Sequence, residues 1–204
     1  MTALAFVDDT IGSPPPAPPA RPRVLLIGTA LGCAAIVMAF AGLIGLYAER
    51  RASTVRGGGT WLPKGVVIDL TPFNVALIGL GISCVVMQWA VYCVTNNDRQ
   101  RAYLALGLSA LLGAAYINGV AFAYTQMGFT VHDPSGVGVL VYVISGMHLA
   151  MTGAGIVFIG LMAFRTLGGQ YSGRDKEGIV AVSIYWYVTV AVYAVIWYTI
   201  FVTK

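Results

Sequence analysis

One of the two histidines, His148, is the residue whose type and position come closest to supporting chemistry. His148 lies near the middle of a long apolar segment, with Ser145 one helical turn before it and Thr152 one turn after it. A neutral imidazole there can be hydrogen-bonded within its own helix or to a neighbouring helix. A haem with two axial ligands or a zinc site would need further ligands, and the sequence offers no second one. We therefore expect His148 to be a structural residue at a helix interface.

Three cysteines and two amides are further candidates within the apolar segments. Cys33, Cys84 and Cys93 form no Cys-x-x-Cys pair and have no histidine near them in sequence, so they are expected to be small buried hydrophobic side chains. Asn118 and Gln88 are expected to form hydrogen bonds between helices. The sequence thus predicts no catalytic, cofactor-binding or metal-ligating residue.

Aromatic side chains crowd the last apolar segment. At the ends of a membrane-spanning helix such rings form interfacial belts, whereas near its middle they pack against other helices or line a cleft for acyl chains. Both roles stay open, and no nearby charge supports a catalytic tyrosine. The residues are Tyr185, Trp186, Tyr187, Tyr193, Trp197 and Tyr198.

Small residues gathered on one helix face predict close helix packing. The chain holds 25 glycines, so such spacing indicates packing in general and identifies no partner. The residues are Gly28 and Gly32 in the first apolar segment and Gly146, Ala150, Gly153 and Gly155 in the fourth.

Long uncharged segments are the elements that must position these side chains. Hydrophobic residues make up 58% of the chain and charged residues 10%, which excludes an ordinary soluble domain, where about a quarter of the residues are charged. Five segments lack Asp, Glu, Lys and Arg, each can cross about 30 Å of hydrocarbon as a helix, and none alternates like a barrel strand. We expect an all-α fold, an integral membrane bundle of five transmembrane helices. The segments are approximately 24–47, 73–94, 102–124, 137–164 and 179–202.

The polar segments predict a tail, loops and an orientation. Residues 1–22 are expected to form a disordered Pro-rich tail ahead of a five-helix transmembrane domain, 23–204, and 49–72 is expected to be a loop because it holds three consecutive glycines. A cytoplasmic N-terminus is favoured, since seven Lys and Arg then lie in cytoplasmic segments and five opposite. These charges set topology and contact lipid headgroups; they form no nucleic-acid-binding stripe. The seven are Arg21, Arg23, Arg99, Arg101, Arg165, Arg174 and Lys176, and the five are Arg50, Arg51, Arg56, Lys64 and Lys204.

The order of motifs along the chain resembles that of subunit III of the haem-copper cytochrome c oxidases. The first apolar segment carries Met38-Ala39-Phe40-Ala41-Gly42-Leu43, which is similar to the first helix of the short, five-helix bacterial form of that family. These motifs cover about half of the chain and are similar to a divergent five-helix bacterial member. The later matches are Tyr142, Ser145-Gly146-Met147-His148, Arg165, Gly169-Gln170-Tyr171-Ser172 followed by Gly178, and Tyr185-Trp186.

Several positions depart from the family pattern. Every acidic side chain that is usual at membrane depth is lost, which favours a divergent member that keeps the helix packing and the lipid cleft. The departures are Ile36 for a glutamate, Tyr116 and Asn118 in place of a Tyr-Glu pair, Met151 for a second histidine, Tyr187 for the histidine of a Tyr-Trp-His motif, and Val190 for an aspartate.

The resemblance implies an accessory, non-catalytic subunit of a respiratory complex in the bacterial plasma membrane. No cofactor is then expected in this chain, and haem and copper are expected in the partner subunits I and II. The chain is expected to support the catalytic subunit by helix packing and to bind membrane phospholipid in a cleft. The complex could be an oxidase or a related nitric oxide reductase. The matching structural or lipid-cleft candidates are His148, Tyr185, Trp186, Gly146 and Tyr142.

Other classes of membrane protein stay open on the residues alone. A small transporter or channel would need inverted repeats, helices broken at depth or polar groups along a path, and the many glycines could hide a broken helix. A metal-dependent oxygenase subunit would need clustered His, Asp or Glu, which His148 alone does not supply. An orphan membrane scaffold is the remaining alternative.

Overall fold

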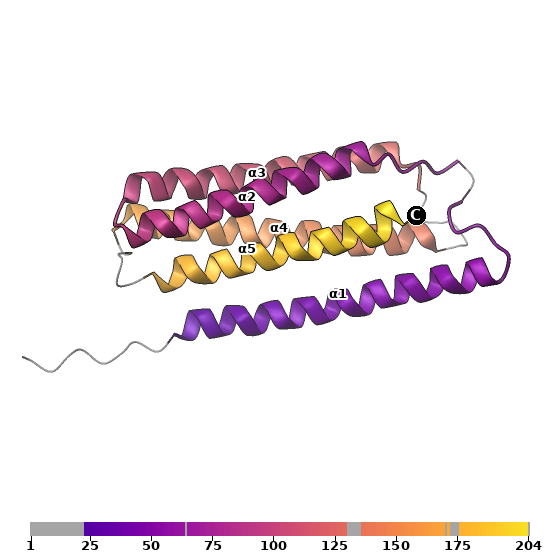
Figure 1. Cartoon of the computed structure of the whole chain (residues 1–204), viewed down its shortest axis with the longest axis horizontal. Helices are drawn as coiled ribbons and strands as arrows, with labels where there is room; N and C mark the ends of the chain where they lie inside the picture. The colour runs from indigo at the N-terminus through magenta and orange to yellow at the C-terminus, as the bar shows by residue number, and fades with distance from the viewer. Residues whose placement is uncertain (1–22, 64, 130–135, 170, 172–175, 204) are drawn as a thin grey trace, which may run out of the picture.

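Five long helices make up the computed structural model, which describes residues 23–63, 65–129, 136–169, 171 and 176–203. Figure 1 shows them side by side along one long axis. The predicted tail, 1–22, lies outside the described residues. The bounds are α1 Val24–Arg56, α2 Thr71–Thr95, α3 Arg99–Gln126, α4 Val137–Leu167 and α5 Glu177–Ile196, which a π-helical segment, Trp197–Val202, continues.

Each of the five helices is long and apolar enough to cross a membrane. They have 25 to 33 residues, with α5 and its π-helical end counted together, and about 20 helical residues suffice to span the hydrocarbon core. No strand occurs among the described residues. The predicted all-α bundle with five transmembrane helices is confirmed.

The first helix is longer than the sequence predicts. α1 continues past Tyr47 to Arg56, so the prediction of a loop over 49–72 is wrong for its first part. The extra turns carry one Glu and three Arg, and they stay helical because charged turns can project into water beyond the bilayer. At the end, the Arg56 Nε donates a 3.2 Å hydrogen bond to the Ala52 carbonyl, which suits the negative end of the helix dipole. Gly58 then turns the chain away with φ of +78°.

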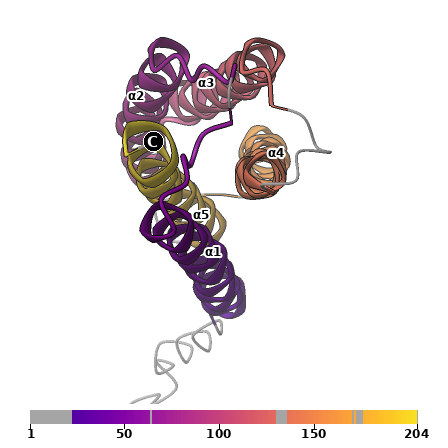
Figure 2. The same ribbon diagram turned by 90° about the vertical axis from the view of Figure 1, so that its right-hand side faces the viewer.

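α5 is the central helix of the bundle. It packs against α1, α2 and α4, while α2 and α3 form an antiparallel hairpin and α3 packs in turn on α4. Figure 2 shows α1 on the outside, along α5 and away from the α2–α3 hairpin. α1 buries only Cys33, Phe40 and Tyr47, which are spaced by two helical turns. A single narrow seam therefore holds α1 to the rest of the protein.

The π-helical segment anchors the end of α5 against the start of α2. The ring of Phe201 stacks on that of Phe73, with 3.6 Å between centroids. The Trp197 Nε1 donates a 2.8 Å hydrogen bond to the Asn74 Oδ1. π-helical turns are rare and often lie next to functional sites, and this one faces the end of α1.

Candidate functional site

His148 lies fully buried between three helices, with both ring nitrogens engaged. On α4, its Nδ1 lies 2.7 Å from the Tyr116 hydroxyl of α3, and its Nε2 lies 2.9 Å from the Thr189 carbonyl oxygen of α5. A carbonyl oxygen only accepts, so Nε2 carries a proton, and in the neutral tautomer Nδ1 accepts from the Tyr116 hydroxyl. Neither nitrogen therefore presents a lone pair to a metal without breaking a buried hydrogen bond.

Aromatic rings enclose this histidine. Tyr116 meets it edge-on with 5.4 Å between ring centroids, Tyr193 of α5 lies at the same distance, and Phe40 of α1 lies at 6.2 Å. The Tyr193 hydroxyl donates in turn to the Phe73 carbonyl of α2, at 3.2 Å. The cluster thus joins all five helices at one level of the bundle.

Trp186 forms a second buried junction. Its side chain is fully buried, and its Nε1 donates a 2.8 Å hydrogen bond to the Ser83 Oγ of α2. Gly113 of α3 and Gly155 of α4 leave the space that the indole fills: a Cβ on either would lie 2.5 Å and 3.0 Å from its ring. Gly155 belongs to the predicted small-residue face, whereas Ser83 and Gly113 carry no local signal that would have identified them.

The remaining three candidates do not gather at one place. The Tyr142 hydroxyl donates to the Phe129 carbonyl at 3.3 Å, and the Tyr185 hydroxyl donates to the Met151 carbonyl at 2.9 Å. A Cβ added to Gly146 would meet nothing within 4 Å, so no other helix approaches it closely among the described residues. None of the five candidates lines the three grooves on the outer surface of the helices or the pocket between the ends of α1 and α5.

Two polar residues at membrane depth face outward. The Gln88 amide oxygen accepts a 2.7 Å hydrogen bond from the Tyr187 hydroxyl, which joins α2 to α5 as predicted for an interhelical amide. Asn118, in contrast, is exposed on α3, and its amide makes no hydrogen bond to any described residue. The expected interhelical bond of Asn118 is therefore not made within the described part of the chain.

No metal-binding group is present among the described residues: nowhere do three His, Cys, Asp or Glu side chains lie close enough to hold an ion. Cys33, Cys84 and Cys93 are free thiols, and only Cys84 is more than slightly exposed.

Apolar grooves open on the outer surface of the helices. One of about 480 Å³ lies between α3 and α4, where Tyr103, Gly107 and Leu111 face Gly160 and Phe164. Another of about 380 Å³ lies between α2 and α3. A third, of about 590 Å³, lies where the start of α2 meets the end of α3. Grooves of this shape and apolar lining suit acyl chains.

The comparisons with known proteins agree on one family. The sequence model of "Cytochrome c oxidase subunit III" matches residues 21–204. The chain is 26% identical over 186 residues to a cytochrome c oxidase subunit 3 of Corynebacterium diphtheriae, covering 90% of this chain and 88% of that protein. It is 29% identical over 191 residues to a probable cytochrome c oxidase subunit 3 of Mycobacterium tuberculosis, covering 87% and 89%.

A longer relative is matched only in part. The cytochrome c oxidase subunit 3 of Strongylocentrotus purpuratus is 29% identical over 153 residues, and the match covers 74% of this chain but only 58% of that protein. The family match itself spans every described helix. This multi-pass membrane protein therefore belongs to the cytochrome c oxidase subunit III family, whose members are accessory subunits of the haem-copper oxidase.

Proposed function

We propose that this chain supports the catalytic core of a bacterial haem-copper oxidase by packing against subunits I and II, which carry the haem and copper. The observation that carries this proposal is the state of His148. Its two nitrogens are both engaged in bonds between helices, so the one intramembrane histidine ties the bundle together and is not poised to bind a cofactor. Four of the five family-matching candidates then serve packing within the bundle, with His148 and Trp186 as the two junctions, whereas Gly146 makes no close contact with another described helix.

The exposed apolar surface supports a role in binding phospholipid. Large hydrophobic side chains face outward from every helix; among them are Leu31, Val85, Leu111, Phe164 and Tyr198. The groove between α3 and α4 offers a shaped surface for an acyl chain, and this groove replaces the region of Tyr185 and Trp186 as the proposed lipid cleft, because Trp186 is fully buried.

Asn118 supports a protein contact on α3. An amide without a hydrogen-bonding partner is costly in hydrocarbon, whereas another membrane helix can supply that partner. The small residues Ala114 and Ala115, which lie one turn before Asn118 and are also exposed, would let such a helix approach closely. We therefore place a contact with a partner subunit on this face.

The charges at the two ends of the bundle support a cytoplasmic N-terminus. The start of α1, the α2–α3 turn, the end of α4 and the start of α5 lie at one end in Figure 1. Among the described residues, that end carries Arg23, Arg99, Arg101, Arg165 and Lys176, and the other end carries Arg50, Arg51 and Arg56. The excess of positive charge marks the cytoplasmic side.

Purification through a tag on the N-terminal segment tests the proposal. After gentle detergent extraction, mass spectrometry of the eluate is expected to find oxidase subunits I and II. The molar amount of each is expected to equal that of this chain. Isolation of the chain by itself, from membranes that contain an active oxidase, would contradict the proposal. The transporter alternative gains no support from the described helices, since their one irregular segment, Trp197–Val202, lies at a helix end and not at mid-depth.

A further inference from the structure

Tyr116 holds its phenol against a buried base. Its hydroxyl lies 2.7 Å from the His148 Nδ1, with 4% of Tyr116 and none of His148 exposed. Because the His148 Nε2 donates to the Thr189 carbonyl, the neutral imidazole has its lone pair on Nδ1, toward the phenol. The O–H group of Tyr116 therefore points at a nitrogen that is able to take its proton.

Other tyrosine hydroxyls donate to groups that are poor bases. The Tyr124 hydroxyl donates to the Ser145 Oγ at 2.6 Å, and the Tyr193 hydroxyl donates to the Phe73 carbonyl at 3.2 Å. Hydroxyl, carbonyl, amide and thioether acceptors hold a hydrogen bond but are far weaker bases than an imidazole. Among these tyrosine hydrogen bonds, that of Tyr116 alone ends on a base. The remaining donors are Tyr142, Tyr171, Tyr185 and Tyr187.

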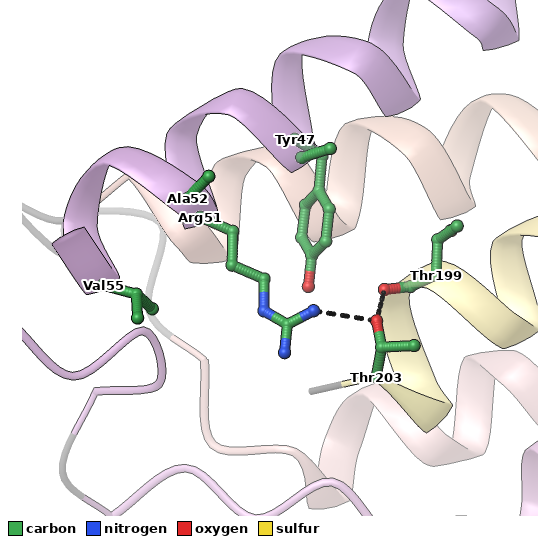
Figure 3. Close-up of a pocket in the computed structure, with 7 residues that line it drawn as sticks. Tyr47, Arg51, Ala52, Val55, Thr199 and Thr203 are labelled. Carbon is green, nitrogen blue, oxygen red and sulfur yellow. Dashed lines mark hydrogen bonds between the residues drawn. The ribbon is translucent and has the colours of Figure 1, made fainter.

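Tyr47 is a buried tyrosine in a different setting. It lines a pocket of about 350 Å³ between the end of α1 and the π-helical end of α5, which Figure 3 shows. Its hydroxyl accepts a 3.0 Å hydrogen bond from the Trp61 Nε1. In the same pocket the Arg51 Nη1 donates a 2.9 Å hydrogen bond to the Thr203 Oγ1. A guanidinium beside a phenol opposes the removal of an electron from it, because it adds to the positive charge that would be formed.

Oxidation of a buried phenol leaves a positive charge that the site must hold. The radical cation of a phenol is a strong acid, so the proton and its charge move to the strongest base in contact, which for Tyr116 is the His148 imidazole. Both N–H groups of the imidazolium then have acceptors, since Nε2 keeps the Thr189 carbonyl and Nδ1 donates to the phenoxyl oxygen. The pair can therefore lose an electron without breaking a buried hydrogen bond.

The ring of Tyr116 also lies beside the outer surface of the bundle. It lines the groove of about 380 Å³ between α2 and α3, together with Ala115 and Gly119. Ala115 is exposed and belongs to the α3 face on which we place the contact with a partner subunit. An electron can therefore leave the ring across the wall of this groove.

We propose that Tyr116 is a redox-active tyrosine that gives one electron to a high-valent metal centre outside this chain, with His148 as the base that takes its proton. The phenol O–H bond breaks, an N–H bond forms at Nδ1, and the electron reduces the metal centre by one equivalent. A neutral phenoxyl radical stays beside an imidazolium, and the proton moves back when an electron returns. This inference goes beyond the proposed function, since it gives the chain a chemical role that needs no bound cofactor, and its test needs no partner subunit.

A tethered photo-oxidant tests the site in the full-length chain in detergent. A ruthenium tris-bipyridine complex is attached to the chain through Ala115→Cys, and Cys84→Ser prevents labelling of the partly exposed native thiol. A flash in the presence of an external electron acceptor generates ruthenium(III), and electron paramagnetic resonance of rapidly frozen samples counts tyrosyl radicals per chain. We expect a tyrosyl radical whose phenoxyl oxygen is coupled to an exchangeable deuteron after transfer to heavy water.

Three variants of this labelled chain separate the roles. Tyr116→Phe is expected to abolish the radical. His148→Asn keeps a hydrogen-bonding amide without a base, and the rate of radical formation is expected to fall by about a hundredfold or more, the usual size of a lost general base. Tyr124→Phe, on the same helix, removes a phenol that donates to a serine hydroxyl and is expected to leave the radical and its rate of formation unchanged.

Several outcomes would overturn the proposal. They are the absence of a tyrosyl radical, its persistence in Tyr116→Phe, its loss in Tyr124→Phe, or an unchanged rate in His148→Asn. If His148→Asn does not fold, the comparison of light and heavy water in the labelled parent keeps the test open. Radical formation is expected to be slower in heavy water because the O–H bond breaks in this step, and equal rates in the two solvents would overturn the role of His148 as the base.

Discussion

Replacement of Gly113 by alanine is expected to destabilise the bundle, although alanine is the better helix former. The added Cβ would lie 2.5 Å from the Trp186 Cη2 and 3.2 Å from the Ile156 Cγ1. The indole cannot swing aside without losing its 2.8 Å bond to Ser83, and Gly155 holds its other edge. Overpacking of this kind costs about 1–3 kcal/mol, and the gain in helix propensity is about 1 kcal/mol. The expected net loss in the free energy of unfolding is up to about 2 kcal/mol.

The same helix offers a matched control. A Cβ on Gly107 meets nothing within 4 Å, so Gly107→Ala is expected to be neutral or to stabilise the chain by up to about 1 kcal/mol through helix propensity alone. Unfolding of both variants by sodium dodecyl sulfate in mixed micelles, followed by circular dichroism, measures the difference. Equal stability of Gly113→Ala and Gly107→Ala would refute the idea that α3 needs a glycine to admit the indole.

Three further substitutions probe the polar groups of the bundle. His148→Phe leaves the Tyr116 hydroxyl and the Thr189 carbonyl without their partner, so the same unfolding titration should show a loss of about 2–4 kcal/mol; an unchanged midpoint would contradict a structural role. Ser83→Ala leaves the buried indole N–H of Trp186 without an acceptor and should lower the free energy of unfolding by about 1–2 kcal/mol. An unchanged free energy of unfolding would mean that the bond contributes nothing. Asn118→Leu should leave the stability of the isolated chain unchanged but weaken its retention in the oxidase by about threefold, as judged by subunit ratios after detergent washing; unchanged retention would remove the proposed contact on α3.

The five spans could be predicted from the sequence because the bilayer imposes them. A helix in hydrocarbon must satisfy its own backbone and carry about 20 residues without charge, and both demands are visible in the order of residues. The position where α1 ends could not be predicted in the same way. Once the helix leaves the hydrocarbon, charge no longer forbids it, so the segment from Glu49 to Arg56 gives no signal of helix or loop by hydropathy.

The buried junctions depend on contacts between distant parts of the chain. Trp186 and Ser83 are 103 positions apart, and His148 meets Thr189 across 41 positions. The sequence predicts that His148 will bond to a neighbouring group, yet the pairing depends on how α3, α4 and α5 pack. Gly113 looks like any of the other glycines until the indole is placed beside it.

The pocket at the end of α1 could not be predicted from the sequence. Arg51 and Thr203 are 152 positions apart, and each is an ordinary polar residue at a helix end. Their meeting depends on α1 running on past the apolar segment and on α5 ending in a π-helical turn.

Separation of this chain from its oxidase shows whether the chain carries a haem or copper redox centre of its own. After purification of the complex, a stronger detergent releases the chain, and each fraction is analysed by visible absorption and by haem and copper content. We expect all haem bands and all copper to stay with the remaining subunits, while the released chain is colourless, folded and metal-free. Haem or copper that travels with the released chain, at one equivalent or more, would contradict an accessory role without a haem or copper redox centre.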